Sequence, residues 1–435
     1  MSDTDLIFLG HTDLSGHVRG KGLMRRDYDG GKRAVGWTPT NAFITCFGGI
    51  APSPFGALGD VMLTADPETL VLVEEPDWPL AERFVLGNVS EIADGAPWPL
   101  CPRSQLTSVL DRLARQHGLT VKAAFEHEFH VDGVEANAGF GYRLEAHRRL
   151  GAFPDRLASV LTRAGLVVEN ILPEYGSGQV EVSISPRDAL RAADEATALR
   201  ELARGTARSL GLTVSFAPIL DPAWVGNGVH IHFSLGDLSG NPVNYDPSRP
   251  DDMSERAGAF LAGILAHMPA VLAFTASAAT SYLRLTPHRW SAAYNNLGKQ
   301  DREAGLRICP VFQGADPHRA FHFEYRAADA SASPHLALAA VLAAGMAGLD
   351  ANLPAPVPTA QDVSLLPDEQ LAERGLVRLP QSLSEALDAV AASPLPRAAF
   401  GDVMADGFVA HKRHEAAAAE QWDLATQCTR YAEVY

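Results

Sequence analysis

Acidic and imidazole side chains recur at two-residue spacing in apolar, strand-like segments of this chain. In an extended strand, side chains two residues apart point to the same face. Ionised side chains are costly to bury among apolar neighbours unless they are paired or bind a cation. The pattern therefore predicts a sheet face that gathers carboxylates and imidazoles. The residues concerned are Glu126 and Glu128, Glu174 and Glu181, His230 and His232 in "GVHIHFSL", and His322, Glu324 and Arg326 in "AFHFEYRA".

In a single segment, this alternation could be that of a half-buried strand whose charged residues simply face solvent. The presence of four such segments makes that explanation weaker. Carboxylates that converge on one site repel each other unless cations lie between them. An oxygen-rich ligand set with histidine and without cysteine suits Mg²⁺ or Mn²⁺ better than structural zinc. Such ions most often bridge nucleotide phosphates. The chain has no GxxxxGK[ST] loop, so a P-loop fold is not indicated.

A second set of candidate residues is cationic. A single arginine is usually a solvated surface group, but several near an acidic metal site would bind phosphate or carboxylate groups. The candidates are Arg284, Arg302, Arg307, Arg319 and Arg326.

Composition narrows the class of protein. The net charge of −16 argues against a nucleic-acid or anionic-membrane partner. We find no run of about 18 apolar residues that would indicate a membrane span, and the acidic start "MSDTDLIFLG" lacks the features of a signal peptide. The four cysteines are scattered, with no zinc spacing and no disulfide framework. These features predict a soluble enzyme in the reducing cytoplasm.

The order of turn and helix signals predicts two domains of the α+β class. The Pro-rich stretch 97–103 reads as a linker between a β-rich domain, residues 1–100, and a larger domain, residues 101–435. An amphipathic helix is expected at 104–118, where Gly118 ends it. Long Ala-rich helices are expected around 187–210, 252–282 and 333–350, and the Pro-rich loops at 240–252 and 353–362 are expected to be exposed.

The order of these motifs resembles that of the glutamine synthetase family, in its bacterial-type branch. The matching elements, which cover nearly the whole chain, are "DLSGHVRGK" at 13–21, "GDVMLTADPETL" at 59–70, E-x-E at 126–128, E with GQ-x-E at 174–181, G-x-H-x-H-x-S at 228–234, SY-x-RL at 281–285, R-x-x-x-x-RI at 302–308 and E-x-R at 324–326. Each element alone is weak, whereas their order and spacing together are highly specific.

The resemblance implies an N-terminal β-grasp domain, a catalytic domain with a curved antiparallel sheet and flanking helices, and a homo-oligomer, expected to be a dodecamer of two hexameric rings. It implies ATP as a substrate, two or three Mg²⁺ or Mn²⁺ ions in each site, and an acyl-phosphate intermediate. The roles it implies are metal binding by Glu126, Glu128, Glu174, Glu181, His230 and Glu324; ATP binding by Glu169, His232, Ser234, Arg307 and Arg319; glutamate binding by Arg284, Gly226 and Arg326; and catalysis by Arg302, Arg326 and Arg284.

Departures from the family pattern bear on the substrate. Trp290 stands where ammonia-using members carry an acidic residue, and the segment "VGWTPTNAFITCFGG" at 35–49 lacks their aspartate. A small cation has thus lost its partners and a large flat apolar surface has been gained. Val225 replaces an asparagine of the glutamate site, and His322 replaces an arginine that meets ATP. The exchange at Trp290 favours an organic amine, aryl or alkyl, as in γ-glutamylanilide or γ-glutamylpolyamine synthetases, and a polyamine fits less well because a dication would want carboxylates.

Three alternatives remain open at this point. In the first, Trp290 is a packing residue on a rearranged loop. In the second, the chain is an ordinary ammonium-using glutamine synthetase. In the third, it is a catalytically inactive structural or regulatory oligomer, which the complete set of metal ligands argues against.

Overall fold

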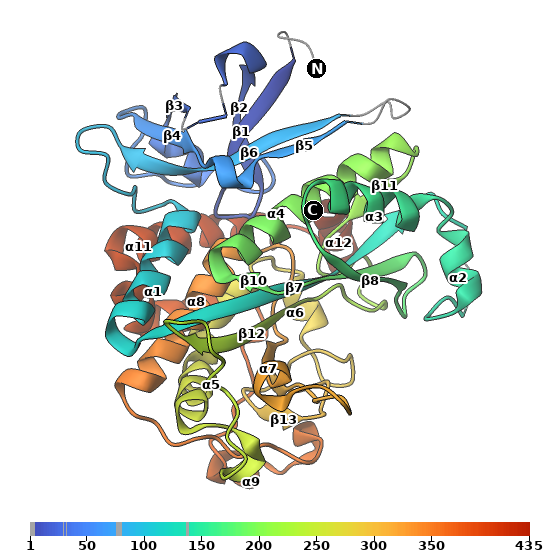
Figure 1. The fold of residues 1–435 in the computed structure, drawn as a ribbon, viewed down its shortest axis with the longest axis vertical. Coiled ribbons are helices and arrows are strands. Elements are labelled where there is room, and N and C mark those ends of the chain that lie inside the picture. Colours follow the sequence, from blue (N-terminus) through green and yellow to red (C-terminus); the bar gives the residue numbers. More distant parts are fainter. Residues whose placement is uncertain (1–4, 29, 32, 75–80, 136–138) are drawn as a thin grey trace.

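A six-stranded N-terminal sheet packs against a larger body that is built around a nine-stranded sheet (Figure 1). The computed structural model describes residues 5–28, 30–31, 33–74, 81–135 and 139–435. The N-terminal sheet has the order β2-β1-β6-β4-β3, with β5 paired to β6, and its β1–β6 pair is parallel. Its strands are β1 (Leu6–Thr12), β2 (Val18–Met24), β3 (Ala34–Trp37), β4 (Val61–Ala65), β5 (Val71–Val73) and β6 (Glu82–Glu91).

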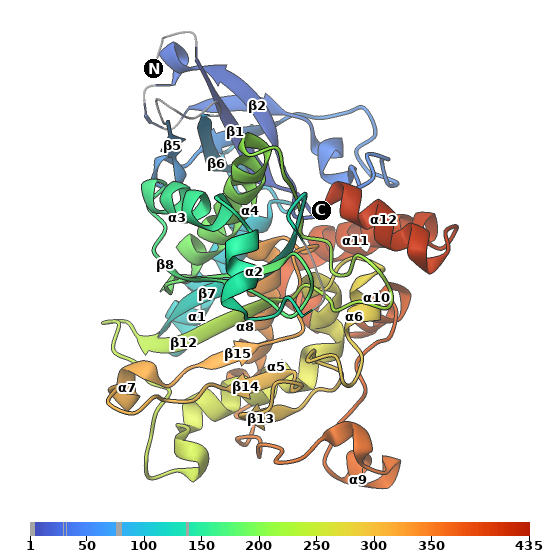
Figure 2. The same cartoon turned by 90° about the vertical axis from the view of Figure 1, so that its right-hand side faces the viewer.

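The larger sheet carries the segments that the sequence singled out. Its order is β13-β14-β15-β12-β7-β9-β8, with β10 and β11 paired to β7, and all its pairs are antiparallel except β13–β14 (Figure 2). The strands are β7 (Leu119–Asp132), β8 (Val168–Pro173), β9 (Gln179–Ile184), β10 (Arg187–Asp188), β11 (Thr213–Ser215), β12 (Val229–Asp237), β13 (Leu297–Lys299), β14 (Leu306–Ile308) and β15 (Phe323–Tyr325).

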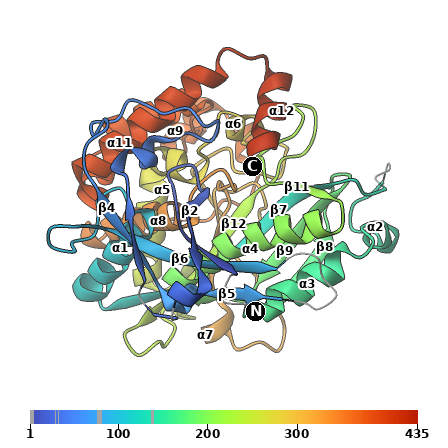
Figure 3. The ribbon, with the colours of Figure 1, turned by 90° about the horizontal axis from the view of Figure 1, so that it is seen from above.

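Helices cover one face of this sheet and leave the other open. Along β7, Phe125, His127 and Phe129 are buried, whereas Glu126 and Glu128 on the opposite face are partly exposed. This period-two alternation is that of a sheet with one packed face. Helices α1 (Pro102–His117) and α4 (Ala189–Ser209) contact β7, and the view from above shows α4 lying along it (Figure 3).

The remaining helices build the core below and beside the sheet. The long pair α5 (Glu255–Thr275) and α8 (Pro334–Asp350) pack closely, since a Cβ on Gly263 would come 2.3 Å from the Ala344 carbonyl oxygen. The others are α2 (Leu144–Arg149), α3 (Phe153–Arg163), α6 (Ser281–Arg284), α7 (Pro317–Ala320), α9 (Asp368–Glu373), α10 (Leu383–Ala392), α11 (Leu395–Ala419) and α12 (Leu424–Val434), with 3₁₀ turns at Arg25–Asp27, Pro39–Phe43, Pro67–Thr69, Pro250–Asp252 and Val363–Leu365.

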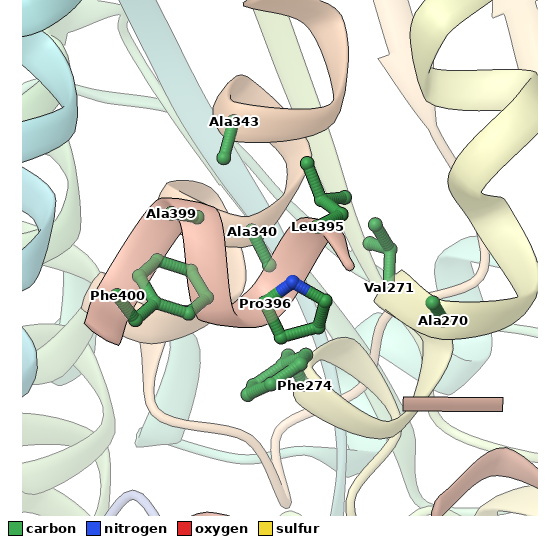
Figure 4. Close-up of a pocket in the computed structure, with 9 residues that line it drawn as sticks. All are labelled: Ala270, Val271, Phe274, Ala340, Ala343, Leu395, Pro396, Ala399 and Phe400. Carbon is green, nitrogen blue, oxygen red and sulfur yellow. The ribbon is translucent and has the colours of Figure 1, made fainter. Parts of the chain in front are cut away.

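Within the described part of the chain, α5 is the one helix long and apolar enough to cross a membrane, but 78% of its most apolar window is buried inside the protein. Core helices of soluble proteins have the same composition. Between α5, α8 and α11 lies a small apolar void, lined by residues such as Phe274, Ala340 and Pro396 (Figure 4). Its lining offers no polar partner for a ligand, which identifies it as a gap in core packing.

The expected α+β class and the expected long helices are confirmed. The stretch 97–103, expected to be a linker, lies between the last strand of the N-terminal sheet and α1 and is packed rather than exposed. Trp98, Leu100 and Cys101 are buried, and α1 already begins at Pro102. Apolar side chains between the proline residues pack this stretch into the core, which a reading by proline content alone does not reveal.

Candidate active site

Cross-strand pairing brings the acidic and imidazole side chains together on the open face of the larger sheet. In the pairing of β7 with β12, Glu126 lies opposite His230, and in the pairing of β7 with β9, Glu128 lies opposite Glu181. Glu324 on β15 lies opposite His232 of β12. Directly opposed side chains in antiparallel sheets are close neighbours. The four segments therefore contribute to one site, as the sequence predicted.

One half of this site is a pair of carboxylates held by imidazoles. His230 Nδ1 lies 3.1 Å from Glu126 Oε2 and 3.4 Å from Glu324 Oε1, and His232 Nε2 lies 3.5 Å from Glu126 Oε2. Burial alone would raise the pKa of Glu126, but hydrogen bonds with His230 and His232 lower it overall. Glu324 behaves alike: its pKa falls to about 2 in spite of burial, because His230 and Arg326 favour the charged form.

The other half holds carboxylates that lack a compensating charge. Burial, together with the negative charges of Glu126 and Glu128, raises the pKa of Glu181 to about 10. Burial also raises the pKa of Glu174, although Tyr142 donates a 2.7 Å hydrogen bond to its Oε2. Acidic groups that hold protons because burial and neighbouring negative charges disfavour their charged form are suited to a divalent cation, which would replace those protons. The donor set is oxygen-rich with one histidine, so it fits a hard divalent ion.

Arg284 forms a candidate site for an anion beside the carboxylate cluster. Its side chain is 3% exposed and packs on Gly226 and Gly228, where a Cβ would come within 2.5 Å of Arg284 side-chain atoms. Its Nη2 donates to the carbonyl of Arg326 at 3.1 Å, whereas its Nη1 is buried with no hydrogen-bond partner among the described residues. A buried guanidinium group with a free donor is suited to a carboxylate ligand.

Two further arginines lie against Glu324. Arg307 donates to Glu324 Oε2 at 2.7 Å, and Arg326 donates to Glu324 Oε1. Arg326 also donates to the carbonyls of Arg302 at 3.0 Å and Trp290 at 3.3 Å. Arg326 therefore holds both the Glu324 carboxylate and the backbone of the loop that carries Trp290.

That loop is held in an unusual backbone conformation. His288 and Trp290 have φ values of 63° and 53°, in the left-handed region that bulky residues rarely adopt. The carboxylate of Glu303 accepts the backbone N–H groups of both residues, at 3.0 and 3.1 Å. Such conformations persist where the surroundings enforce them and are frequent at functional sites. Glu303 is the residue that enforces this one, and sequence reasoning did not identify it.

The loop forms one wall of a cleft of about 390 Å³. The Trp290 side chain is 59% exposed, and its ring lies 6.2 Å from that of Tyr175, which is also exposed. Arg302 and Tyr294 line the same cleft, as do three carboxylates, those of Asp301, Glu303 and Asp362. Tyr175 and these acidic residues were missed in the sequence because they come from separate loops. Tyr175, Asp301 and Glu303 had a local signal, since Tyr175 directly follows the candidate ligand Glu174 and the two acidic residues flank the candidate Arg302.

Some predicted residues lie outside the central cluster. Arg319 on α7 has a side chain that is 85% exposed, 3.8 Å from Asp316. Glu169 on β8 is exposed and accepts a hydrogen bond from Ser185. Ser234 follows His230 and His232 on the same face of β12. The assignment of these three residues to ATP stays a prediction.

Comparisons with known proteins show the family that the chain resembles. Residues 99–431 match the family model described as "Glutamine synthetase, catalytic domain". The chain is 34% identical to the γ-glutamylpolyamine synthetase GlnA3 of Streptomyces coelicolor, and the match covers 84% of this chain and 79% of that protein. It is 29% identical to a glutamine synthetase of Pyrococcus abyssi, and that match covers 82% of this chain and 79% of the relative. A crystal structure of a "novel glutamine synthase homolog" superposes with a TM-score of 0.90 at 41% identity, covering 100% of this chain and 99% of that one. A GmaS/ADP complex superposes with a TM-score of 0.82 at 25% identity, covering 97% and 95%.

Proposed function

The chain belongs to the glutamine synthetase family, and from this premise we propose that it uses ATP to join an organic amine to the γ-carboxyl group of glutamate. Members of this family are oligomeric ligases that depend on ATP and divalent metal ions. The open question is therefore which nucleophile this member accepts.

The observation that carries the proposal is the pair of exposed aromatic rings beside the catalytic arginines. Trp290 lines the cleft, and the Tyr175 ring lies 6.2 Å from the ring of Trp290. The carbonyl of Trp290 accepts a hydrogen bond from Arg326. Ammonium is small, hydrated and cationic, so an indole wall offers it little beyond a cation–π contact. The apolar body of an organic amine can instead be buried against both rings.

The cleft carboxylates narrow the class of amine. Both carboxylate oxygens of Glu303 accept hydrogen bonds from the backbone of the Trp290 loop. The other acidic residues of the cleft lining are Asp301 and Asp362. Their negative charge favours an alkylamine that carries positive charge over a neutral arylamine. A second ammonium group on the same molecule would be stabilised there, and the first relative named above is described as acting on polyamines. These carboxylates remove the main argument from the sequence against a polyamine.

The metal set is proposed on the donor chemistry of the sheet face. Glu128, Glu174 and Glu181 would hold one Mg²⁺ or Mn²⁺ ion, and Glu126, His230 and Glu324 a second. Such ions, when bound, neutralise the charge on the ATP phosphates. A third ion in each site is a prediction from the family resemblance alone.

The chain's own residues then perform two steps. Arg284 binds a carboxylate of glutamate through its unpartnered Nη1, and Arg326 orients the other carboxylate. A γ-carboxylate oxygen attacks the terminal phosphorus of ATP, ADP leaves, and Arg302 stabilises the charge on the transferred phosphoryl group. The free amine attacks the resulting acyl phosphate. A C–N bond forms, phosphate leaves, and the surplus proton on nitrogen passes to phosphate or solvent.

A dodecamer of two hexameric rings is proposed as the assembly, on the family resemblance. A catalytically inactive oligomer remains the alternative from another class. Metal-dependent binding of ATP separates the two, because an inactive member would not be expected to retain six candidate metal ligands at one site.

The proposal is tested by phosphate release with ATP, glutamate and a panel of nucleophiles. The panel contains ammonium, methylamine, a bulkier monoamine, an aromatic amine and an α,ω-diamine. We expect kcat/KM to rise with apolar size and to be highest for a cationic alkylamine. A preference for ammonium over every organic amine would overturn the proposal and leave Trp290 as a packing residue.

A further inference from the structure

A cysteine and two histidines meet beside the carboxylate cluster, and we propose that they form a site for a thiophilic divalent cation such as Zn²⁺. The residues are His232 on β12, Cys309 just after β14, and His322 just before β15. One ligand atom of each lies within 4.8 Å of the others. The proposal concerns an ion and a ligand set distinct from the oxygen-rich site, and the binding it describes does not depend on the identity of the amine.

The distances suit tetrahedral zinc. His232 Nδ1 lies 3.2 Å from His322 Nε2, and Cys309 Sγ lies 3.8 Å from His232 Nδ1. With Zn–N bonds of about 2.05 Å and a Zn–S bond of about 2.3 Å, tetrahedral geometry places two nitrogens about 3.3 Å apart and a sulfur and a nitrogen about 3.6 Å apart. The observed separations differ from these values by only about 0.1–0.2 Å. The third separation, between Cys309 and His322, is within 4.8 Å, so three donors already surround one point that an ion could occupy.

The imidazoles already have the orientation that ligation needs. His322 Nδ1 lies 2.7 Å from the carbonyl oxygen of Ala320, which can only accept. This fixes the proton on Nδ1 and leaves the Nε2 lone pair facing His232 and Cys309. His232 turns its Nε2 toward the carboxylate of Glu126 at 3.5 Å, so its Nδ1 faces the proposed ion. Metal-binding histidines usually have such a carbonyl or carboxylate partner on the second nitrogen.

Ligand chemistry separates the two sites. A thiolate with two imidazoles selects zinc and related ions, whereas Mg²⁺ prefers carboxylate oxygens. Cys309 is 5% exposed and lies at the sheet face, so it is sheltered from bulk solvent but adjacent to the site. His232 is shared, because its other nitrogen faces the carboxylates of the oxygen-rich half. An ion on Nδ1 would therefore fix the side chain that the proposed function assigns to ATP.

The binding test is titration of the reduced, full-length protein with Co²⁺ in saturating Mg²⁺, followed by absorption spectroscopy. Cobalt bound to a thiolate gives a sulfur-to-cobalt charge-transfer band, which carboxylate-bound cobalt lacks. We expect this band at one equivalent per subunit, and its loss on addition of Zn²⁺. The Cys309→Ser variant should lack the band, and His322→Ala should weaken binding by roughly 100-fold or more, since losing even an outer partner of a ligand costs about 10–100-fold.

Cys428→Ser is the matched control, because Cys428 is a buried cysteine on α12. It should keep the full band. Absence of a thiolate band in the wild type, or a band that survives Cys309→Ser, overturns the proposal. His322→Ala gives a second route to the same answer if Cys309→Ser fails to fold, and a Co²⁺ affinity unchanged in His322→Ala also overturns it.

A separate measurement connects the ion to nucleotide use. Zn²⁺ at one equivalent above the protein, in excess Mg²⁺, should raise the KM for ATP in the wild type and leave that of Cys309→Ser unchanged. This effect rests on the proposed function, whereas the cobalt spectrum does not, so the two can fail independently.

Discussion

Replacing Trp290 with alanine tests the amine pocket most sharply. The side chain is 59% exposed, so of the roughly 250 Å² of an indole side chain about 150 Å² is free to contact a ligand. An amine that covers half of this removes about 75 Å² from water, which is worth about 2 kcal/mol at about 25 cal/mol per Å². This corresponds to a roughly 25-fold lower kcat/KM for a bulky amine.

The assay compares a bulky alkylamine with methylamine in steady-state kinetics. Methylamine covers little of the ring, so its kcat/KM should fall by less than about threefold. Trp290→Phe should retain most of the activity with the bulky amine, because a second aromatic surface replaces the first. Phe312→Ala removes an exposed ring outside the cleft lining and should change neither value. Alanine keeps a Cβ at the left-handed position, so backbone strain is similar in both proteins.

An equal loss for both amines would refute this reasoning, since it would mean that the variant disturbs the loop and with it Arg326. No loss for either amine would equally refute it, because the ring would then lie outside the pocket.

Three further predictions follow from the same geometry. Arg284→Ala should raise the KM for glutamate by at least about 30-fold in initial-rate measurements, because a charge-assisted contact worth roughly 2 kcal/mol or more is lost; an unchanged KM would point to another acid. Glu128→Ala and Glu324→Gln should each abolish turnover at saturating Mg²⁺ while leaving the assembly seen by gel filtration unchanged, and near wild-type activity would contradict the metal assignment. Burial lowers the pKa of His11 and His411 from 6.5 to about 4. Between about pH 6.5 and pH 4 the unfolded chain therefore binds protons that the folded protein does not, and the free energy of unfolding should fall by up to about 3 kcal/mol for each histidine. Urea unfolding between pH 7 and pH 4 measures this loss, and a stability independent of pH there would contradict the prediction.

Sequence spacing was enough to place the candidate metal ligands on one face, because their positions depend on strand period. The strands that carry Glu126, Glu128, His230 and Glu324 place mostly apolar residues between these side chains, with His127 as the exception. Such alternation assigns a face without knowledge of the strand order. That these side chains lie close together was inferred from the energetic cost of burying charges without compensation. The structure shows this pairing directly in the register of β7, β12 and β15.

The loops could not be read in the same way. Glu303 holds the backbone of Trp290, 13 positions earlier in the chain, and the Tyr175 ring approaches the ring of Trp290 from another loop. Cys309 was set aside because the sequence shows no zinc spacing, yet β14 carries it next to His232, 77 positions away in the chain. Contacts of this kind depend on turn geometry and strand order, neither of which leaves a periodic signal.

The most direct test of the central claim is a competition in one vessel. The wild-type protein is given ATP, glutamate, Mg²⁺ and equal concentrations of ¹⁵N-ammonium and an α,ω-diamine, and mass spectrometry measures the ratio of the two amide products. This ratio equals the ratio of the two kcat/KM values and does not depend on enzyme concentration. We predict a large excess of the γ-glutamyl diamine product. An excess of ¹⁵N-labelled glutamine would contradict the account.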